Sequence, residues 1–328
     1  MKSAHPSGWA FLLAGTIGLC APSGAATQEL RLISPIDCDL NGPCHIQQYV
    51  DHDPGAQASD FTCSSLTYDG HKGTDFALPA QSMIADGVNV LAAAAGTVRG
   101  LRDGMPDTGY TSETADLVRD RECGNGVVLT HPGGWETQYC HLREGSLGVT
   151  NGQSVAAGDK LGEVGMSGRA QFAHVHLSVR KDGEVVDPFD PDGTIVCGTP
   201  STETLWAEEI PTRPGGIITL GFANGVPDFE TVKQGAVPPA SRTGGALVIW
   251  SYLFGTRAGD TLLLRLDGPQ GEVISRSIPL DRTQAQSFRA IGKRSGSSDW
   301  PAGDYSGVAE MRRAGSVLDR AEITLTLP

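Results

Sequence analysis

After Cys197 the sequence contains no histidine and no cysteine, although the chain of 328 residues has eight histidines and seven cysteines. Imidazole and thiolate groups are the usual ligands of zinc, and imidazole is the usual proton carrier near neutral pH. Chemistry of either kind is therefore expected in the first 200 residues. The remainder is expected to have a different role.

Basic residues are scarce as well. Lys and Arg number 25 against 38 Asp and Glu, which gives a formal net charge of -13. Nucleic-acid binding and adsorption to an anionic surface both need a basic face, so this balance argues against both. No apolar run reaches the roughly 20 residues that a membrane-spanning helix requires. We therefore expect no membrane span and a soluble mature chain.

The amino terminus has the pattern of a secretory signal peptide. Lys2 precedes an apolar run over residues 9–20, and small residues follow at 23–26. This order predicts a signal peptide over residues 1–26 and an exported protein, periplasmic or extracellular. A buried core helix is the alternative. A lipid anchor on Cys20 is disfavoured because Leu19 stands where a small residue is expected.

Six cysteines remain after that cleavage. An even number in an oxidising compartment favours three disulfides. A structural zinc site built from Cys38, Cys44 and His45 is the alternative. A hairpin folded about Gly133 would bring two cysteines together, so we expect the pairs Cys123–Cys140 and Cys38–Cys44, which leaves Cys63 for Cys197.

Helical periodicity is hard to find, and short β-branched runs bounded by Gly, Asp and Pro recur instead. In the first part these runs cover residues 88–91, 126–130, 137–142, 160–164 and 175–179. Seven more follow at 217–220, 246–254, 261–266, 272–278, 286–290, 305–310 and 321–327. The pattern predicts an all-β protein whose second part is an antiparallel β-sandwich of immunoglobulin-like type.

Two short motifs contain candidate metal ligands. His71 and Asp75 are four apart, which is too far to share a metal in an extended strand, but Gly70 and Gly73 allow a sharp fold between them. In residues 172–179, apolar and polar residues alternate, so His174, His176 and Ser178 share one face of a strand. Taken alone, the first spacing is common in loops, and the second also fits an exposed polar strand face.

A third imidazole, His141, ends the expected hairpin. Taken together the three contexts are more specific. Three protein ligands of the His, Asp and His type leave one coordination position open, as a hydrolytic zinc centre requires. Zinc lowers the pKa of bound water and polarises a carbonyl, and further imidazoles can transfer protons or stabilise an oxyanion.

These motifs resemble those of the lysostaphin-type, or LytM-type, zinc metalloendopeptidases that act on peptidoglycan. The resemblance rests on His71-x-x-x-Asp75, Tyr139-x-His141-Leu142 and His174-x-His176, and on similar intervening runs at 90–98 and 152–168. It covers roughly residues 65–190. It implies a small antiparallel β-fold with a groove in which His71, Asp75 and His176 bind one zinc ion. It also implies that His141 and His174 are catalytic.

The resulting division is a signal peptide (1–26), a disulfide-stapled extension (27–64), a zinc metallopeptidase domain (65–198), a linker (199–216) and a β-sandwich accessory domain (217–328). We expect an exported zinc endopeptidase that hydrolyses amide bonds in peptidoglycan stem or cross-link peptides. Two alternatives stay open. One is a non-catalytic, zinc-holding module that binds the wall or activates a hydrolase, with an unknown ligand for the C-terminal domain. The other is a secreted general protease.

Three features lie outside the resemblance. Residues 27–64 could cover the groove or supply an extra ligand, although a disulfide-stapled surface loop is favoured by their turn-rich composition. A long polar insertion at 103–121 could form a groove wall. His45, His52 and His131 are expected at the surface.

Overall fold

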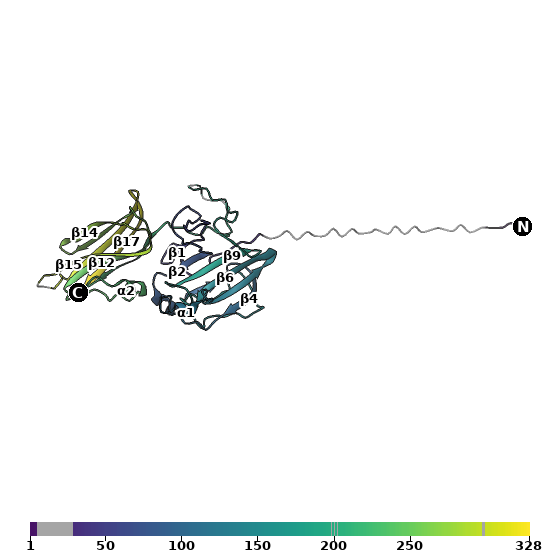
Figure 1. Ribbon diagram of the computed structural model, residues 1–328, viewed down its shortest axis with the longest axis horizontal. Coiled ribbons are helices and arrows are strands. Elements are labelled where there is room, and N and C mark those ends of the chain that lie inside the picture. Colours follow the sequence, from purple (N-terminus) through teal and green to yellow (C-terminus); the bar gives the residue numbers. More distant parts are fainter. Residues whose placement is uncertain (5–28, 198, 200, 202, 297–298) are drawn as a thin grey trace.

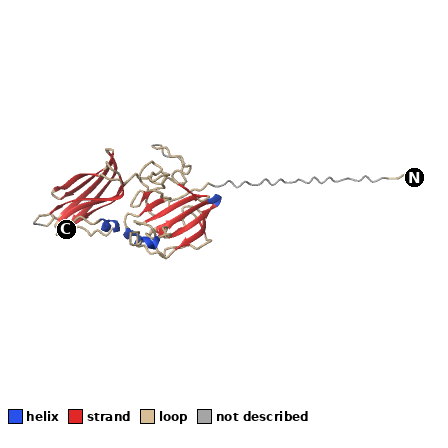
Figure 2. Ribbon diagram, in the orientation of Figure 1, coloured by secondary structure: helices blue, strands red, loops and turns tan. Residues whose placement is uncertain are grey.

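The computed structural model describes residues 1–4, 29–197, 199, 201, 203–296 and 299–328. The predicted signal peptide, apart from its first four residues, and Cys20 lie outside the described residues. Among these residues no helix is both apolar enough and long enough to cross a membrane. Strands dominate, and every strand pairing is antiparallel, so the predicted all-β class is confirmed (Figures 1 and 2).

The first part of the chain is built on an eight-stranded sheet in the order β1-β2-β9-β6-β5-β4-β7, with β10 pairing with β9. A separate two-stranded sheet joins β3 to β8. The strands have these bounds: β1 His45–Gln48, β2 Thr74–Ala77, β3 Asn89–Leu91, β4 Gly96–Arg102, β5 Asn125–His131, β6 Trp135–Leu142, β7 Ser154–Val155, β8 Lys160–Glu163, β9 His174–Lys181 and β10 Glu184–Val186. Short helices occur at η1 (Gln81–Asp86), α1 (Ala115–Val118) and η2 (Pro132–Gly134).

Strand β9 shows why the sheet has one apolar and one polar face. Val175, Leu177 and Val179 are at most 1% exposed and lie in the hydrophobic core of this part of the chain. The intervening residues face the opposite side of the sheet, as the period-two alternation predicts. The strand that carries two of the candidate site histidines is therefore fixed by its buried neighbours.

The hairpin predicted around Gly133 is confirmed. Strands β5 and β6 pair with His131 opposite Trp135, and the turn between them places Gly133 at φ 76°. This left-handed conformation suits glycine. The folded hairpin brings Cys123 and Cys140 together in a disulfide.

All three predicted disulfides are present. Besides Cys123–Cys140, Cys38 bonds to Cys44 and Cys63 bonds to Cys197. With Cys38 and Cys44 bonded to each other, the alternative zinc site built on them is excluded. The Cys63–Cys197 bond spans 134 residues. In the chain-entropy model a loop of that length stabilises the fold by about 4–5 kcal/mol.

The second part of the chain forms two antiparallel sheets around a shared core. One sheet has the order β11-β12-β15 and the other β14-β13-β16-β17, with these bounds: β11 Gly216–Ala223, β12 Ala246–Thr256, β13 Thr261–Gly268, β14 Gly271–Pro279, β15 Gln284–Arg294, β16 Gly303–Arg313 and β17 Ser316–Leu327. Ile249 of one sheet and Leu264 of the other are fully buried in this core. All seven predicted strands are present in this two-sheet arrangement, and its immunoglobulin-like type stays a prediction.

One helix in this part, α2 (Phe229–Gln234), was not predicted. Asp228 caps it, since its side chain accepts a hydrogen bond from the backbone N–H of Thr231. Gly235 ends it in the left-handed conformation that is common at helix C-termini. In Figure 1, α2 lies beside the C-terminal sheets on the side that faces the first part of the chain.

The two parts are in direct contact. The side-chain amide of Gln47 donates a 2.8 Å hydrogen bond to the carbonyl of Ala285. Phe254, at the C-terminal end of β12, is fully buried in the core of the first part, where its ring lies 4.5 Å from that of His45. Leu205 and Trp206, which belong to the expected linker, are buried in the same core.

Candidate metal centre

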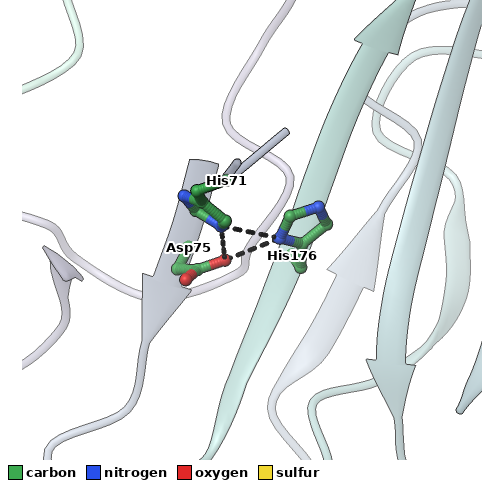
Figure 3. Close-up of side chains that lie close together, drawn as sticks. All are labelled: His71, Asp75 and His176. Atoms are coloured by element: carbon green, nitrogen blue, oxygen red, sulfur yellow. Dashed lines mark hydrogen bonds and ion pairs between the residues drawn. The ribbon is translucent and has the colours of Figure 1, made fainter. Parts of the chain in front are cut away.

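Three side chains converge at the polar face of the large sheet. His71 Nε2 lies 3.2 Å from Asp75 Oδ1 and 3.1 Å from His176 Nδ1, and the last two atoms are 2.8 Å apart (Figure 3). Tetrahedral zinc with bonds of 2.0–2.2 Å would separate its ligand atoms by about 3.3–3.5 Å. The three atoms therefore already lie within about half an ångström of the spacing that one such ion requires. Among the described residues, these three side chains form the cluster of potential ligands that could hold a metal ion.

Strand register accounts for the convergence. Asp75 of β2 pairs directly with His176 of β9, so the two side chains share one face of the sheet. His71 reaches them from the turn that precedes β2. Gly70 takes a φ of 74° in that turn, and a Cβ on Gly73 would lie 2.5 Å from His176 Nε2. Both glycines that were expected to permit the fold are therefore required by it, one for its conformation and one for space.

The outer nitrogen of each candidate ligand histidine is held by a hydrogen bond. His71 Nδ1 lies 2.6 Å from the carbonyl of Tyr49, which can only accept, so this nitrogen bears the proton. His176 Nε2 lies 3.0 Å from Ser178 Oγ, whose own hydrogen is donated to the carbonyl of Lys72 at 2.7 Å. His176 therefore donates to the serine. When both rings are neutral, the inner nitrogens have lone pairs that face Asp75.

The two remaining histidines follow the same rule. His141 Nδ1 donates to the carbonyl of Ser167 at 2.8 Å, and His174 Nδ1 donates to the carbonyl of Phe172 at 2.9 Å. Their Nε2 atoms are thereby free for chemistry. The two rings lie 4.7 Å apart, and His174 Nε2 is 3.5 Å from Asp75 Oδ1.

The backbone of His141 is unusual. Its φ of 64° lies in the left-handed region, which is sparsely populated by residues other than glycine. Its N–H donates a 2.8 Å hydrogen bond to the carbonyl of Cys123, whose disulfide partner Cys140 is the residue before it. The disulfide and this hydrogen bond hold His141 in a conformation that would otherwise cost of order 1–3 kcal/mol.

Burial and neighbouring charge set the protonation of the cluster. Burial raises the pKa of the Asp75 carboxyl, but the neighbouring His71 and His174 outweigh this and hold it well below its usual value. Burial lowers the pKa of His141 well below 6.5, and it also lowers that of His174. Asp75 is therefore anionic at neutral pH, while His141 and His174 are neutral and able to accept a proton.

The chain is similar in sequence to a family of known proteins. Residues 69–188 match Peptidase family M23, a span that contains all five of these side chains. Residues 69–188 form a domain of that family. A DD-carboxypeptidase/endopeptidase of Neisseria meningitidis, Mpg, is 38% identical over 65 residues, which cover 20% of this chain and 14% of that protein. The peptidoglycan DD-endopeptidase ShyA of Vibrio cholerae is 26% identical over 136 residues, 40% of this chain and 25% of its own.

This chain spans a quarter or less of the length of these two curated relatives. Among solved structures, the catalytic domain of the prophage-encoded M23 protein EnpA of Enterococcus faecalis is similar. It is 22% identical, with a TM-score of 0.32, and the match covers 46% of this chain and 91% of that domain.

The M23 domain has a groove next to these histidines. A cavity of about 840 Å³ is lined by Asp75, His141, His174 and His176. Thr108, Gly109, Tyr110 and Thr111 also line it, so the polar insertion at 103–121 contributes to the groove wall, as expected.

Residues 27–64 have a different place from the expected surface loop. Their strand β1 is largely buried, with Gln48 9% exposed at the cavity, and forms one edge of the sheet that carries the site. They supply no member of the candidate metal group among the described residues. Instead the carbonyl of Tyr49 fixes the tautomer of His71. A backbone carbonyl has no sequence signature, so this contribution could not be found from the sequence.

The expectation that three other histidines lie at the surface was wrong for two of them and only partly right for the third. His45 is 1% exposed and His131 is 7% exposed. His131 Nδ1 donates a 2.7 Å hydrogen bond to the carbonyl of Ala95, and its Nε2 is hydrogen-bonded to the hydroxyl of Thr137 at 2.9 Å. His52 is half-buried and pairs with Asp187. His45 bonds to Gln47 of its own strand at 3.1 Å, and these hydrogen bonds make the three side chains compatible with their burial.

Proposed function

We propose that this chain is an exported, zinc-dependent endopeptidase that hydrolyses amide bonds in the stem or cross-link peptides of peptidoglycan. His71, Asp75 and His176 would hold one zinc ion, and His141 and His174 would be the catalytic imidazoles. The M23 domain supports a peptidase activity. The name of the Vibrio cholerae relative supports a peptidoglycan substrate. The three disulfides support export, since such bonds persist in oxidising compartments.

One observation carries the metal assignment. His71 Nε2, His176 Nδ1 and Asp75 Oδ1 lie within 3.2 Å of one another, and although burial lowers the pKa of His71, Asp75 raises it. The anionic carboxylate therefore favours positive charge between these atoms, which a proton or a metal cation can supply. Lone pairs and a carboxylate oxygen repel one another unless a cation lies between them. An arrangement of this kind fits a bound cation, and two imidazoles with one carboxylate suit zinc.

Zinc in this position would lower the pKa of a water molecule and polarise the scissile carbonyl. The residues of the chain would do the rest. The neutral Nε2 of one catalytic imidazole, His141 or His174, accepts the proton of the attacking water and later returns it to the leaving amine. The developing oxyanion favours protonation of the other imidazole from solvent water, and the Nε2–H formed in this way donates a hydrogen bond to the oxyanion. The carbonyls of Ser167 and Phe172 keep the rings of His141 and His174 from turning, and the carbonyl of Tyr49 does the same for His71.

Digestion of purified peptidoglycan by the full-length protein tests this proposal. Mass analysis should find new amino and carboxyl termini within stem or cross-link peptides. A chelator should abolish their appearance, and added zinc should restore it. A zinc-loaded protein that leaves peptidoglycan intact would overturn the proposal in favour of a non-catalytic module. Comparable cleavage of casein would favour a general protease instead.

A further inference from the structure

Glutamine is concentrated in the groove. The sequence has twelve glutamines, and six of them are among the 23 residues that line the cavity next to the metal centre. The lining makes up a small part of the 328-residue chain, so this is a strong enrichment. It requires an explanation in terms of what the cavity binds.

The six glutamines come equally from the two parts of the chain. The M23 side contributes Gln48 from β1, Gln81 from η1 and Gln171 from the segment before β9. The C-terminal part contributes Gln234 from α2, and Gln284 and Gln286 from β15. The groove therefore has two walls, and the metal centre lies on one of them.

The amide groups of five of these glutamines make no hydrogen bond among the described residues. The exception is Gln286, whose amide donates to Gln47 Oε1 at 3.2 Å. A carboxamide offers two donors and an acceptor without carrying charge. An extended peptide presents the complementary set, one N–H and one C=O at each residue, so free carboxamides on two walls suit a peptide main chain.

Contacts at two separate places hold the second wall at the groove. At one place Gln47 of β1 bonds to the carbonyl of Ala285 at 2.8 Å. At the other place the end of α2 touches η1, where a Cβ on Gly235 would lie 2.7 Å from the Cβ of Ala80. The C-terminal part is therefore fixed against the M23 domain on both sides of the cavity.

The groove also contains a cation with no carboxylate partner. Arg169 is exposed, and its guanidinium lies 5.4 Å from the centre of the Tyr110 ring. Arg169 forms no ion pair within the part of the chain that the structure describes, whereas Lys233 of the opposite wall is paired with Glu230 at 2.7 Å. In a chain of net charge -13, an unpaired guanidinium in a groove is available for a carboxylate of the ligand.

We propose that the C-terminal part forms the second wall of the substrate groove, and that glutamines on both walls bind the main chain of an acidic peptide. Arg169 binds a carboxylate of that peptide. The inference rests on the proposed function in that it assigns the ligand of the same groove. It makes the C-terminal part a determinant of substrate binding and not a separate accessory module.

A double variant, Gln234→Ala with Gln284→Ala, tests the second wall in the full-length zinc-loaded protein. Losing two or more hydrogen bonds should raise KM for a peptidoglycan peptide about five- to tenfold while kcat stays within twofold. Gln270→Ala is the matched control, because Gln270 is an exposed glutamine of the same part that lies outside the groove. Zinc content and thermal unfolding should be unchanged in both variants, which separates a binding role from a structural one.

Equilibrium binding makes the test independent of turnover. A fluorescent synthetic stem pentapeptide with free carboxylates is titrated with the full-length protein after chelation. The double variant should bind it about five- to tenfold more weakly than the wild type, and Gln270→Ala should bind it equally well. Arg169→Gln should weaken binding of this peptide about tenfold and leave binding of its carboxamide derivative unchanged.

The outcomes separate the two proposals. Unchanged Kd and KM in the double variant, or no binding by the wild type, would overturn the two-walled groove while leaving the endopeptidase proposal in place if peptidoglycan is still cleaved. Weakened binding in a protein that cleaves no peptidoglycan would overturn the endopeptidase proposal and retain the peptide-binding groove. Equal losses for the acidic and the carboxamide peptide in Arg169→Gln would remove the carboxylate assignment.

Discussion

His71 and His176 face each other with Nε2 and Nδ1 3.1 Å apart, and in its neutral form each ring donates its single proton elsewhere. The proton of His71 is held by the carbonyl of Tyr49, and that of His176 is held by the hydroxyl of Ser178. The metal proposal therefore depends as much on these outer contacts as on the three ligands.

Ser178→Ala should weaken metal binding. Without the hydroxyl, His176 Nε2 loses its acceptor, and the ring is free to place its proton on Nδ1, where it would oppose a cation. Loss of such an outer partner typically reduces metal affinity 10–100-fold. Competition for zinc against a chromophoric chelator measures the effect.

Ser251→Ala is the matched control for that variant. Ser251 is also fully buried in a strand, but its hydroxyl has no hydrogen-bond partner and lies outside the groove. We expect its zinc affinity to equal that of the wild type. Equal affinities for the Ser178 and Ser251 variants would show that the outer contact has no part in metal binding.

Removal of the Cys123–Cys140 disulfide should reduce activity more than zinc content. This bond and the hydrogen bond to the carbonyl of Cys123 hold His141 at its positive φ, and His141 is not one of the three proposed ligands. The double Cys-to-Ala variant should keep close to one zinc per chain and lose at least tenfold in kcat. The same change at Cys38 and Cys44, where the disulfide lies away from the groove, should leave kcat within twofold. A similar loss in both would contradict a specific role at His141.

The pair formed by His52 and Asp187 should make stability depend on pH. Burial lowers the pKa of His52, but the 2.7 Å hydrogen bond and the charge of Asp187 outweigh it, and the pKa in the folded state is raised. The pair therefore contributes its full stabilisation below the pKa of His52 in the unfolded chain, about 6.5. This stabilisation is lost as the pH rises through the higher pKa of His52 in the folded state.

Urea unfolding at pH 6 and pH 9 measures this dependence. We expect the wild type to be more stable than His52→Gln. The difference between their free energies of unfolding should be about 1 kcal/mol larger at pH 6 than at pH 9. Other titrating groups contribute equally to both proteins and cancel in the difference. A difference between the two proteins that does not change with pH would contradict the pairing.

Much of the site followed from local sequence. The alternation in 172–179 predicted which histidines share a face, and the glycines beside His71 predicted a fold that brings it to Asp75. The features that depend on tertiary packing could not be predicted from the sequence. Helix α2 has six residues, too few for a periodic pattern, and the buried strand β1 reads as a turn-rich loop. In the sequence, Leu205 and Trp206 are two apolar residues within a polar linker. That they pack into the core of the first part is visible only in the three-dimensional structure.

The distinction between ligands and catalytic imidazoles is the central claim, and His174 and His176 test it because they lie two residues apart on one strand. If His176 ligates zinc, His176→Ala should reduce metal content well below one per chain. Asp75→Ala should do the same. His174→Ala and His141→Ala should keep near-stoichiometric zinc and lose about 10²-fold or more in turnover.

Elemental analysis of these four purified variants, beside peptidoglycan turnover by the same samples, is the most direct measurement. The account predicts that metal is lost in the His176 and Asp75 variants and retained in the inactive His174 and His141 variants. If the His174 variant lost its zinc while the His176 variant retained it, the assignment of ligand and catalytic roles would be contradicted. Full zinc content in all four would contradict the metal centre itself.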